Sequence, residues 1–197
     1  PAAVRAHPPT PPRRSAAPGA RKGQTRAMKT AIYPGSFDPV TLGHLNIIKR
    51  AAAAFDKVIV CVMVNSKKNG GIFTPEERIE LLRKSIHVDN VEFDISNCLV
   101  AEYAKRRDAR ILVKGLRAVS DYEQEVQMAM VNSKINPGLD TVFFPSSEKY
   151  TYLSSSVAKE LARYHADLTD FLPREIVEDV KKKMETRSDE CHGSQQH

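Results

Sequence analysis

The sequence predicts an α/β protein with a five-stranded parallel sheet, doubly wound so that helices cover both faces. Short runs rich in β-branched residues alternate along the chain with segments whose apolar residues recur at helical spacing. The run at 57–64 is apolar at almost every position, which is typical of a strand buried on both faces of a parallel sheet. Strands that alternate with helices in this way are joined by right-handed crossovers.

The pattern places each element in turn. Strands are expected at 30–33, 57–64, 91–95, 110–114 and 140–144, and helices at 43–55, 75–86, 99–107, 121–133, 154–164 and 173–184. The first strand is expected to stop at Pro34 and Gly35, because both residues interrupt strands. The helix at 75–86 has the clearest start, because Thr74 suits an N-cap, Pro75 suits the first helical position and Glu77 completes a capping box.

The basic character of the chain belongs to its first 27 residues. The formal net charge is +6, but residues 1–27 hold six basic residues and no acidic ones, so the other 24 basic residues balance the 24 acidic ones. A near-neutral folded part excludes a basic RNA-binding module. Half of the 12 prolines and no aromatic residue fall in this segment, so we expect residues 1–27 to be a disordered tail.

The boundaries of the folded part follow from the same composition. The arginines of the tail fit a transit peptide, whereas its prolines oppose the amphipathic helix that such peptides form. Met28 stands directly before the first strand, and we expect it to be the natural start, with 1–27 as upstream sequence. One domain is expected at 28–186, followed by a flexible C-terminal tail at 187–197.

Membrane and disulfide-rich classes are disfavoured. No stretch approaches the roughly 18–20 apolar residues that a transmembrane helix needs. The three cysteines, Cys61, Cys98 and Cys191, are far apart and odd in number, and their spacing matches neither a metal site nor a disulfide framework. We therefore expect a reduced, cytoplasmic protein without a membrane partner.

The segment from Tyr33 to His44 joins the first strand to the first helix through a glycine-containing loop. The first turn of a helix has unpaired N–H groups and a partial positive charge, both of which suit a phosphate. Gly43 permits close approach to the backbone, while Ser36 and His44 add a hydroxyl and a ring donor. A glycine or a histidine alone would be an ordinary surface feature, but together they predict a nucleoside triphosphate site.

Ligands of such folds bind beyond the carboxyl ends of the strands, near the point where the strand order reverses. The segments expected there, besides 36–44, are 65–68, 96–100, 114–117 and 145–156. Lys114 and Arg117 flank a glycine in one of them. Another ends in Ser154, Ser155 and Ser156 at a helix start, with Lys159 one turn on. One serine there is ordinarily only a cap, but three in a row also suit a phosphate.

Two of these stretches resemble known signatures. Gly35-Ser36-Phe37-Asp38-Pro39-x-Thr41-x-Gly43-His44 resembles the (Thr/His)-x-Gly-His motif of nucleotidylyltransferases, and Ser154-Ser155-Ser156-x-x-Lys159 resembles their second signature. The segments 114–125 and 73–78 are similar to ones particular to the bacterial phosphopantetheine adenylyltransferase family. The similarity runs from about Lys29 to Lys183. It implies a Rossmann-like nucleotidyltransferase domain at 28–186.

The resemblance also implies a reaction and an assembly. In this family the adenylyl group of ATP is transferred to 4′-phosphopantetheine, giving dephospho-coenzyme A and pyrophosphate in the penultimate step of coenzyme A synthesis. The implied cofactor is Mg²⁺ and the implied assembly is a cytoplasmic homohexamer without a nucleic-acid partner. No carboxylate cluster accompanies the motifs, so no residue is assigned to the metal, which is expected to be held mainly by phosphates and water.

The resemblance assigns roles residue by residue. His44 is implied to bind the α-phosphate and to stabilise the pentacovalent transition state. The residues implied to bind ATP are Ser36, Phe37, His44, Gly115, Leu116, Arg117, Glu125, Tyr150, Thr151, Tyr152, Leu153, Ser154, Ser155 and Ser156. Those implied to bind the acceptor are Ser36, Lys68, Val100 and Lys114, with Lys67 as the alternative to Lys68. No general base is needed, because the attacking phosphate is already an anion.

Two further classes of function stay open on the sequence. Nicotinate mononucleotide adenylyltransferases share both signatures but prefer histidine where this chain has Thr41, and the same residue disfavours a cytidylyltransferase. The domain could alternatively be a nucleotide-binding sensor without catalysis. The presence of His44, Lys114, Arg117 and the serine run opposes that interpretation.

Overall fold

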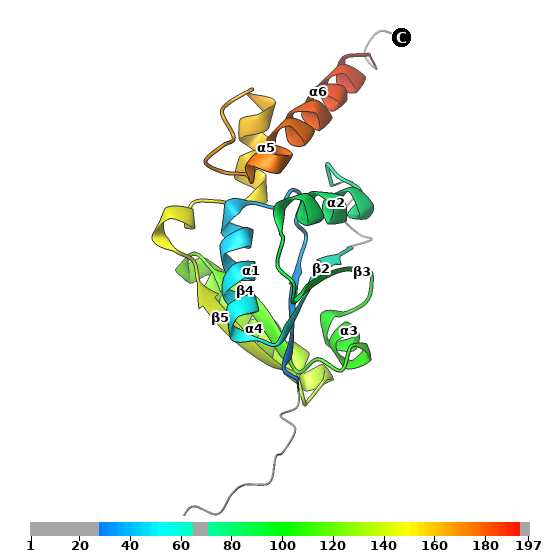
Figure 1. Ribbon diagram of the computed structural model, residues 1–197, viewed down its shortest axis with the longest axis vertical. Helices are drawn as coiled ribbons and strands as arrows, with labels where there is room; N and C mark the ends of the chain where they lie inside the picture. Colours follow the sequence, from blue (N-terminus) through cyan, green and yellow to red (C-terminus); the bar gives the residue numbers. More distant parts are fainter. Residues whose placement is uncertain (1–27, 65–70, 194–197) are drawn as a thin grey trace, which may run out of the picture.

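The computed structural model describes residues 28–64 and 71–193 of the chain. Its centre is a five-stranded sheet with the order β3-β2-β1-β4-β5, in which every neighbouring pair is parallel (Figure 1). The strands are β1 (Thr30–Gly35), β2 (Lys57–Met63), β3 (Val91–Ser96), β4 (Ile111–Leu116) and β5 (Asp140–Pro145). The predicted doubly wound α/β architecture is therefore confirmed.

Helices cover both faces of the sheet. They are α1 (Leu42–Ala54), α2 (Pro75–Ser85), α3 (Val100–Arg106), α4 (Val119–Ile135), α5 (Ser155–Arg163) and α6 (Val177–Gly193), with short 3₁₀ turns η1 (Glu148–Tyr150) and η2 (Arg174–Ile176). Helices α1, α2, α5 and α6 share one core with alternate strand residues such as Val58 and Val60. The residues that alternate with these along β2, Ile59 and Cys61, point to the other face and belong to a second core with α3. Figure 1 shows α5 and α6 beyond the end of the sheet that is opposite to the entry of the chain into β1.

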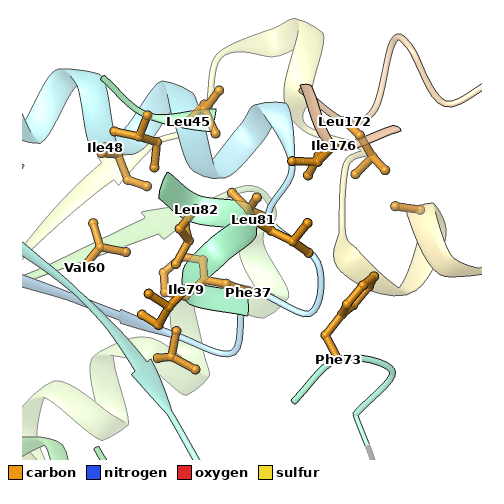
Figure 2. Packing of buried hydrophobic residues seen from close by; sticks show 14 of the residues in the cluster. Phe37, Leu45, Ile48, Val60, Phe73, Ile79, Leu81, Leu82, Leu172 and Ile176 are labelled. Carbon is orange, nitrogen blue, oxygen red and sulfur yellow. The ribbon is translucent and has the colours of Figure 1, made fainter. Parts of the chain in front are cut away.

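The larger core contains a residue from the predicted phosphate loop. Phe37 has no exposed surface and belongs to the same cluster as Ile79 and Leu82 of α2 and Leu172 and Ile176 of the C-terminal part (Figure 2). The loop after β1 is thus anchored by an aromatic side chain as well as by its ends.

Among the described residues, no helix is long and apolar enough to cross a membrane.

Several predicted ends were wrong, that of β1 by two residues and that of α6 by nine. Pro34 and Gly35 do not stop β1, because they continue its pairing with Cys61 and Val62 of β2. A proline is tolerated at this point because β4 pairs with β1 only as far as Ile32, which leaves one side of β1 open from there on. Helix α6 also continues to Gly193 rather than ending at Met184, so residues 187–193, predicted to belong to a flexible tail, are helical. The predicted domain boundaries stay predictions.

The unequal pairing opens the sheet at its carboxyl edge. The β1–β4 ladder stops at the Ile32–Leu112 pair, whereas β1 stays paired with β2 up to Gly35 and β4 stays paired with β5 up to Leu116. The two central strands therefore separate where they end. This is also where the strand order reverses, which is the position at which open α/β sheets bind ligands.

Candidate active site

A cavity of about 400 Å³ lies between the carboxyl ends of β1 and β4. Ten of the predicted site residues line it, namely Ser36, His44, Lys114, Gly115, Arg117, Glu125, Leu153, Ser154, Ser155 and Ser156. These residues come from three stretches that are far apart in sequence: from the end of β1 into α1, from the end of β4 into α4, and at the start of α5. Three of the segments expected at the carboxyl ends of the strands, 36–44, 114–117 and 145–156, therefore contribute to one cavity, which His44, Lys114 and Ser155 all line.

His44 is held at the first turn of α1 by a reciprocal capping box with Thr41. The Thr41 hydroxyl accepts a hydrogen bond from the His44 N–H at 3.4 Å, and the backbone N–H of Thr41 donates to the ring Nδ1 of His44 at 3.1 Å. Because Nδ1 accepts that hydrogen bond, the proton of the neutral ring must be on Nε2. The cap therefore fixes both the orientation and the tautomer of the imidazole.

The surroundings of the imidazole favour its neutral form. The imidazole is partly removed from water, which disfavours its charged form, and the nearby positive charge of Arg117 adds a smaller effect. Together they lower the pKa of His44 to about 4. His44 is thus neutral at physiological pH: it can donate a hydrogen bond from its Nε2–H to an anion, but it lacks the second, acidic proton of an imidazolium. It suits charge stabilisation rather than acid–base catalysis.

Phe37 positions this histidine from below. Its ring centroid lies 5.1 Å from that of His44 and 5.5 Å from that of Tyr33, both in edge-to-face geometry. Gly35 makes room for the ring, because a Cβ at that position would lie 2.8 Å from the Phe37 Cζ atom. Phe37 itself has a left-handed backbone conformation, with φ of 46°. With no exposed surface, it supports His44, and its predicted contact with ATP stays a prediction.

Two cations, Lys114 and Arg117, also line the cavity, and each has a carboxylate partner. The Lys114 Nζ atom lies 3.1 Å from Glu125 Oε2, and the Arg117 Nε atom lies 3.1 Å from Asp121 Oδ2. Arg117 also donates from Nη1 to the carbonyl oxygen of Leu153 at 2.9 Å. Arg117 therefore ties the end of β4 to the serine run, and both cations have fixed positions at the cavity wall.

The three serines do different things. Ser154 is the N-cap of α5, because its hydroxyl accepts the Val157 N–H at 3.1 Å. The Ser155 hydroxyl donates to the carbonyl oxygen of Pro39 at 2.8 Å, which joins α5 to the loop after β1. Ser156 is exposed in the first turn of α5. The N-termini of two helices, α1 and α5, consequently meet at one cavity, and their partial positive charge suits phosphates.

The other predicted site residues are not among those that line the cavity. Leu116 lies in a neighbouring apolar hollow with Val119 and Tyr122. Tyr150 and Thr151 lie at and just after η1, and the ring of Tyr152 packs against Phe171. Val100 is the first residue of α3. Lys67 and Lys68 lie outside the described residues, so the choice between them stays a prediction.

Some cavity residues were missed by the site prediction. They are Tyr33, Pro34, Gly35, Thr41, Gly43, Ile47, Asp121, Gln124 and Ser146. Thr41, Gly43 and Asp121 stand inside the motifs on which the resemblance rests, so the motifs themselves could have indicated them. Ser146 lies in the segment 145–156 that was expected at this edge of the sheet, although no role was assigned to it. Ile47 carries no local signal, because an ordinary helix residue reaches a cavity only through the arrangement of the chain.

The described residues do not form a dedicated metal site. No group of three or more histidine, cysteine, aspartate or glutamate side chains in this part of the chain is arranged to hold an ion. The two cavity carboxylates, Asp121 and Glu125, each already face a cation.

Comparisons with known proteins agree with this geometry. The model of the Cytidylyltransferase-like family matches residues 32–161. A protein named phosphopantetheine adenylyltransferase from Clostridium botulinum (strain 657 / Type Ba4) is 45% identical over 165 residues, which cover 83% of this chain and 99% of that protein. One with the same name from Caldanaerobacter subterraneus subsp. tengcongensis is 50% identical over 157 residues, 79% of this chain and 98% of that protein.

A solved structure supports the fold. The bifunctional NMN adenylyltransferase/ADP ribose pyrophosphatase from Francisella tularensis matches with a TM-score of 0.59 over 75% of this chain and 46% of that chain, at 13% sequence identity. At that identity the match concerns the fold alone. The near-complete coverage by curated relatives decides the family: this chain belongs to the phosphopantetheine adenylyltransferases, within the cytidylyltransferase-like group.

Proposed function

We propose that this chain transfers the adenylyl group of ATP to 4′-phosphopantetheine, giving dephospho-coenzyme A and pyrophosphate. The observation that carries the proposal is a sequence identity of 45–50% to proteins named phosphopantetheine adenylyltransferase, over nearly their whole length. The cavity supports it independently, because it combines a neutral histidine donor, two cations and two helix N-termini at one place. Such an arrangement of donors and positive charges suits the transfer of a phosphorus-containing group between two anions.

The chemistry follows from that arrangement. A phosphate oxygen of the acceptor attacks the α-phosphorus of ATP, a new P–O bond forms, and the bond from the α-phosphorus to the bridging oxygen of pyrophosphate breaks. The nucleophile is already ionised, so no side chain has to remove a proton. His44 donates from Nε2 to the α-phosphate oxygens as their charge grows, and positioning with charge stabilisation supplies the acceleration.

The remaining residues divide between the two substrates. Arg117 and the N-terminus of α5, with Leu153 to Ser156, are proposed to hold the triphosphate side. Lys114 and Ser36 are proposed to hold the phosphate of the acceptor, at the position where β1 and β4 separate. The roles of Leu116, Glu125, Tyr150, Tyr152 and Val100 rest on family resemblance alone, as do those of Phe37, Thr151 and the lysines at 67 and 68.

Magnesium is proposed to accompany ATP rather than to reside in the protein. The chemistry that it would supply is neutralisation of the phosphate oxygens of the leaving group. Asp121 and Glu125 are the nearest carboxylates by position in the cavity, but their cation partners make them poor ligands. A cytoplasmic location is likewise a proposal that rests on the family.

We also propose that the chain assembles into a homohexamer through α4. Only Asn132 of this helix is buried within the chain among the residues whose side chains are described, although the helix is rich in apolar residues. Those that are 44–81% exposed are Val119, Tyr122, Met128, Met130, Val131 and Ile135. Exposed apolar side chains gathered on one helix in this number are typical of a protein–protein interface, so a partner copy is the expected cover. Sedimentation of the wild type and of Met130→Glu tests this assembly. We expect the wild type to sediment as one species of six chains and Met130→Glu to sediment as smaller species. A wild type that sediments as a monomer would contradict the proposal.

One assay tests the reaction itself. Pyrophosphate release is measured with ATP and 4′-phosphopantetheine, and then with ATP and nicotinate mononucleotide. Release with the first acceptor only is the expected result. Release with nicotinate mononucleotide only would replace the proposed acceptor, and ATP binding without release under either condition would support a nucleotide sensor.

A further inference from the structure

Asp38 is a buried carboxylate that the mechanism above does not use. Only 5% of the residue is exposed, yet it is surrounded by donors. The backbone N–H groups of Ile72 and Phe73 donate to its two oxygens at 3.1 and 2.9 Å. The Nε atom of Arg78 lies 3.4 Å from Oδ1, and the Nζ atom of Lys159 donates to Oδ2 at 3.2 Å.

These donors keep the carboxylate ionised. Burial alone would raise the pKa of Asp38, but the hydrogen bonds from Phe73 and Ile72 and the charges of Arg78 and Lys159 outweigh it and lower the pKa below its usual value. A buried charge with this many partners is costly to leave half satisfied, so loss of one partner should disturb the others.

Asp38 and its partners belong to three separate segments. One is the loop after β1, which holds Asp38 itself and whose Ser36 carbonyl oxygen accepts a hydrogen bond from Arg78 Nη1 at 3.2 Å. The second is the entry to α2, where Gly71 passes so close that a Cβ there would lie 3.0 Å from Asp38 Oδ2. The third is α5, which bears Lys159 one turn after the serine run. Two of the three segments thus carry residues that line the cavity.

Lys159 is directed to this cluster and not to the cavity. Its side chain is 24% exposed, it pairs with Asp38, and it is absent from the residues that line the cavity. The sequence suggested that this lysine would join the serines in a phosphate cradle. The observed geometry gives it a different neighbour, and the Ser155–Pro39 hydrogen bond joins the same two segments alongside it.

We propose that Asp38 and Lys159 act together as positioning residues, which fix the serine run of α5 against the loop that carries Ser36 and His44. Lys159 works through Asp38 and does not bind phosphate itself. This inference rests on the proposed adenylyl transfer. Errors of about 1 Å between reacting groups can cost on the order of 100-fold in rate, so the pair should affect turnover more than substrate affinity.

A double-mutant cycle in the full chain tests the pair. The proteins are wild type, Asp38→Asn, Lys159→Met and the double variant, with Lys159→Arg as the conservative variant. Lys183→Met is the control, because it breaks an ion pair between α6 and Glu77 whose lysine side chain is 33% exposed, against 24% for Lys159. For each, kcat and KM for ATP and for 4′-phosphopantetheine are measured, together with the thermal midpoint to verify folding at the assay temperature.

The expected pattern is non-additive. Asp38→Asn and Lys159→Met should each lower kcat by about 10-fold or more with KM for ATP changed by less than about threefold, and the double variant should match the worse single variant. Lys159→Arg should retain kcat within about threefold, and Lys183→Met within about twofold. Singles whose losses multiply in the double variant would overturn the proposal. So would Lys159→Met with normal kcat and a raised KM for ATP, which is the signature of a phosphate ligand.

Two further outcomes keep the test separate from the reaction. If Asp38→Asn does not fold, the contrast between Lys159→Met and Lys159→Arg decides, and equal turnover of those two variants would overturn the proposal. If the wild type releases no pyrophosphate, the proposed function fails instead. In that case the free energy of unfolding of the Lys159 variants, with and without Asp38→Asn where it folds, measures the coupling, and full additivity would refute the pair itself.

Discussion

The neutral state of His44 makes a sharp prediction about stability and pH. In the unfolded chain the pKa of this residue is its ordinary value of 6.5, whereas in the fold it is about 4. Between pH 6.5 and pH 4 the unfolded state therefore binds a proton at this residue that the folded state does not bind. The free energy of unfolding falls as the pH decreases through this range, and the loss levels off near pH 4. Between pH 7 and pH 5 this linkage amounts to about 2 kcal/mol.

His44→Gln isolates that contribution. Glutamine at the third helical position can still accept the Thr41 N–H and complete a capping box, but it does not titrate. Urea denaturation at pH 7, 6 and 5, at one protein concentration, gives the free energy of unfolding of both proteins. We expect the wild type to lose about 2 kcal/mol more than His44→Gln between pH 7 and pH 5. Parallel pH curves for the two proteins would refute the buried neutral imidazole.

Three other substitutions test parts of the same account. His44→Ala should lower kcat by about 100-fold or more while the affinity for ATP, measured by calorimetry, changes little, because the ring acts mainly on the transition state; unchanged turnover would refute that role. Gly35→Ala should destabilise the fold by about 1–3 kcal/mol in urea and also reduce kcat, because the new Cβ would lie 2.8 Å from the ring that supports His44; a neutral effect on both would show that the ring can shift freely. Glu77→Ala should cost about 1 kcal/mol in urea with little change in kcat, because it removes the capping box of α2 and the partner of Lys183; a large loss of kcat would instead couple this cap to the cavity.

The sequence was most informative where local patterns and the general rule for parallel sheets coincide. The β-strand runs and helical spacings fix the order of elements, and the rule that ligands bind at the carboxyl edge then brings Ser36, His44, Lys114 and Ser155 together without any knowledge of contacts. The capping box at Thr74 and Glu77 was also predictable, because it depends on only four consecutive residues.

Features that depend on distant partners escaped the sequence. Pro34 was expected to end β1, because nothing local shows that the strand pairs on one side only at that point. Asp38 was given no role of its own by the sequence, since its partners lie 34 to 121 residues away. The ring of Phe37 was assigned to ATP by resemblance, but core packing decides its direction. Its neighbour Gly35 shows the same dependence, because the glycine is needed only for that ring.

Transfer of a labelled phosphorus tests the central claim most directly. When the chain is incubated with ATP labelled at the α-phosphorus and 4′-phosphopantetheine, the label should appear in dephospho-coenzyme A, and the pyrophosphate should stay unlabelled. His44→Ala should slow this transfer by about 100-fold or more without changing where the label goes. Label that stays in ATP, or that ends in ADP because the γ-phosphoryl group was transferred instead, would contradict adenylyl transfer at this cavity.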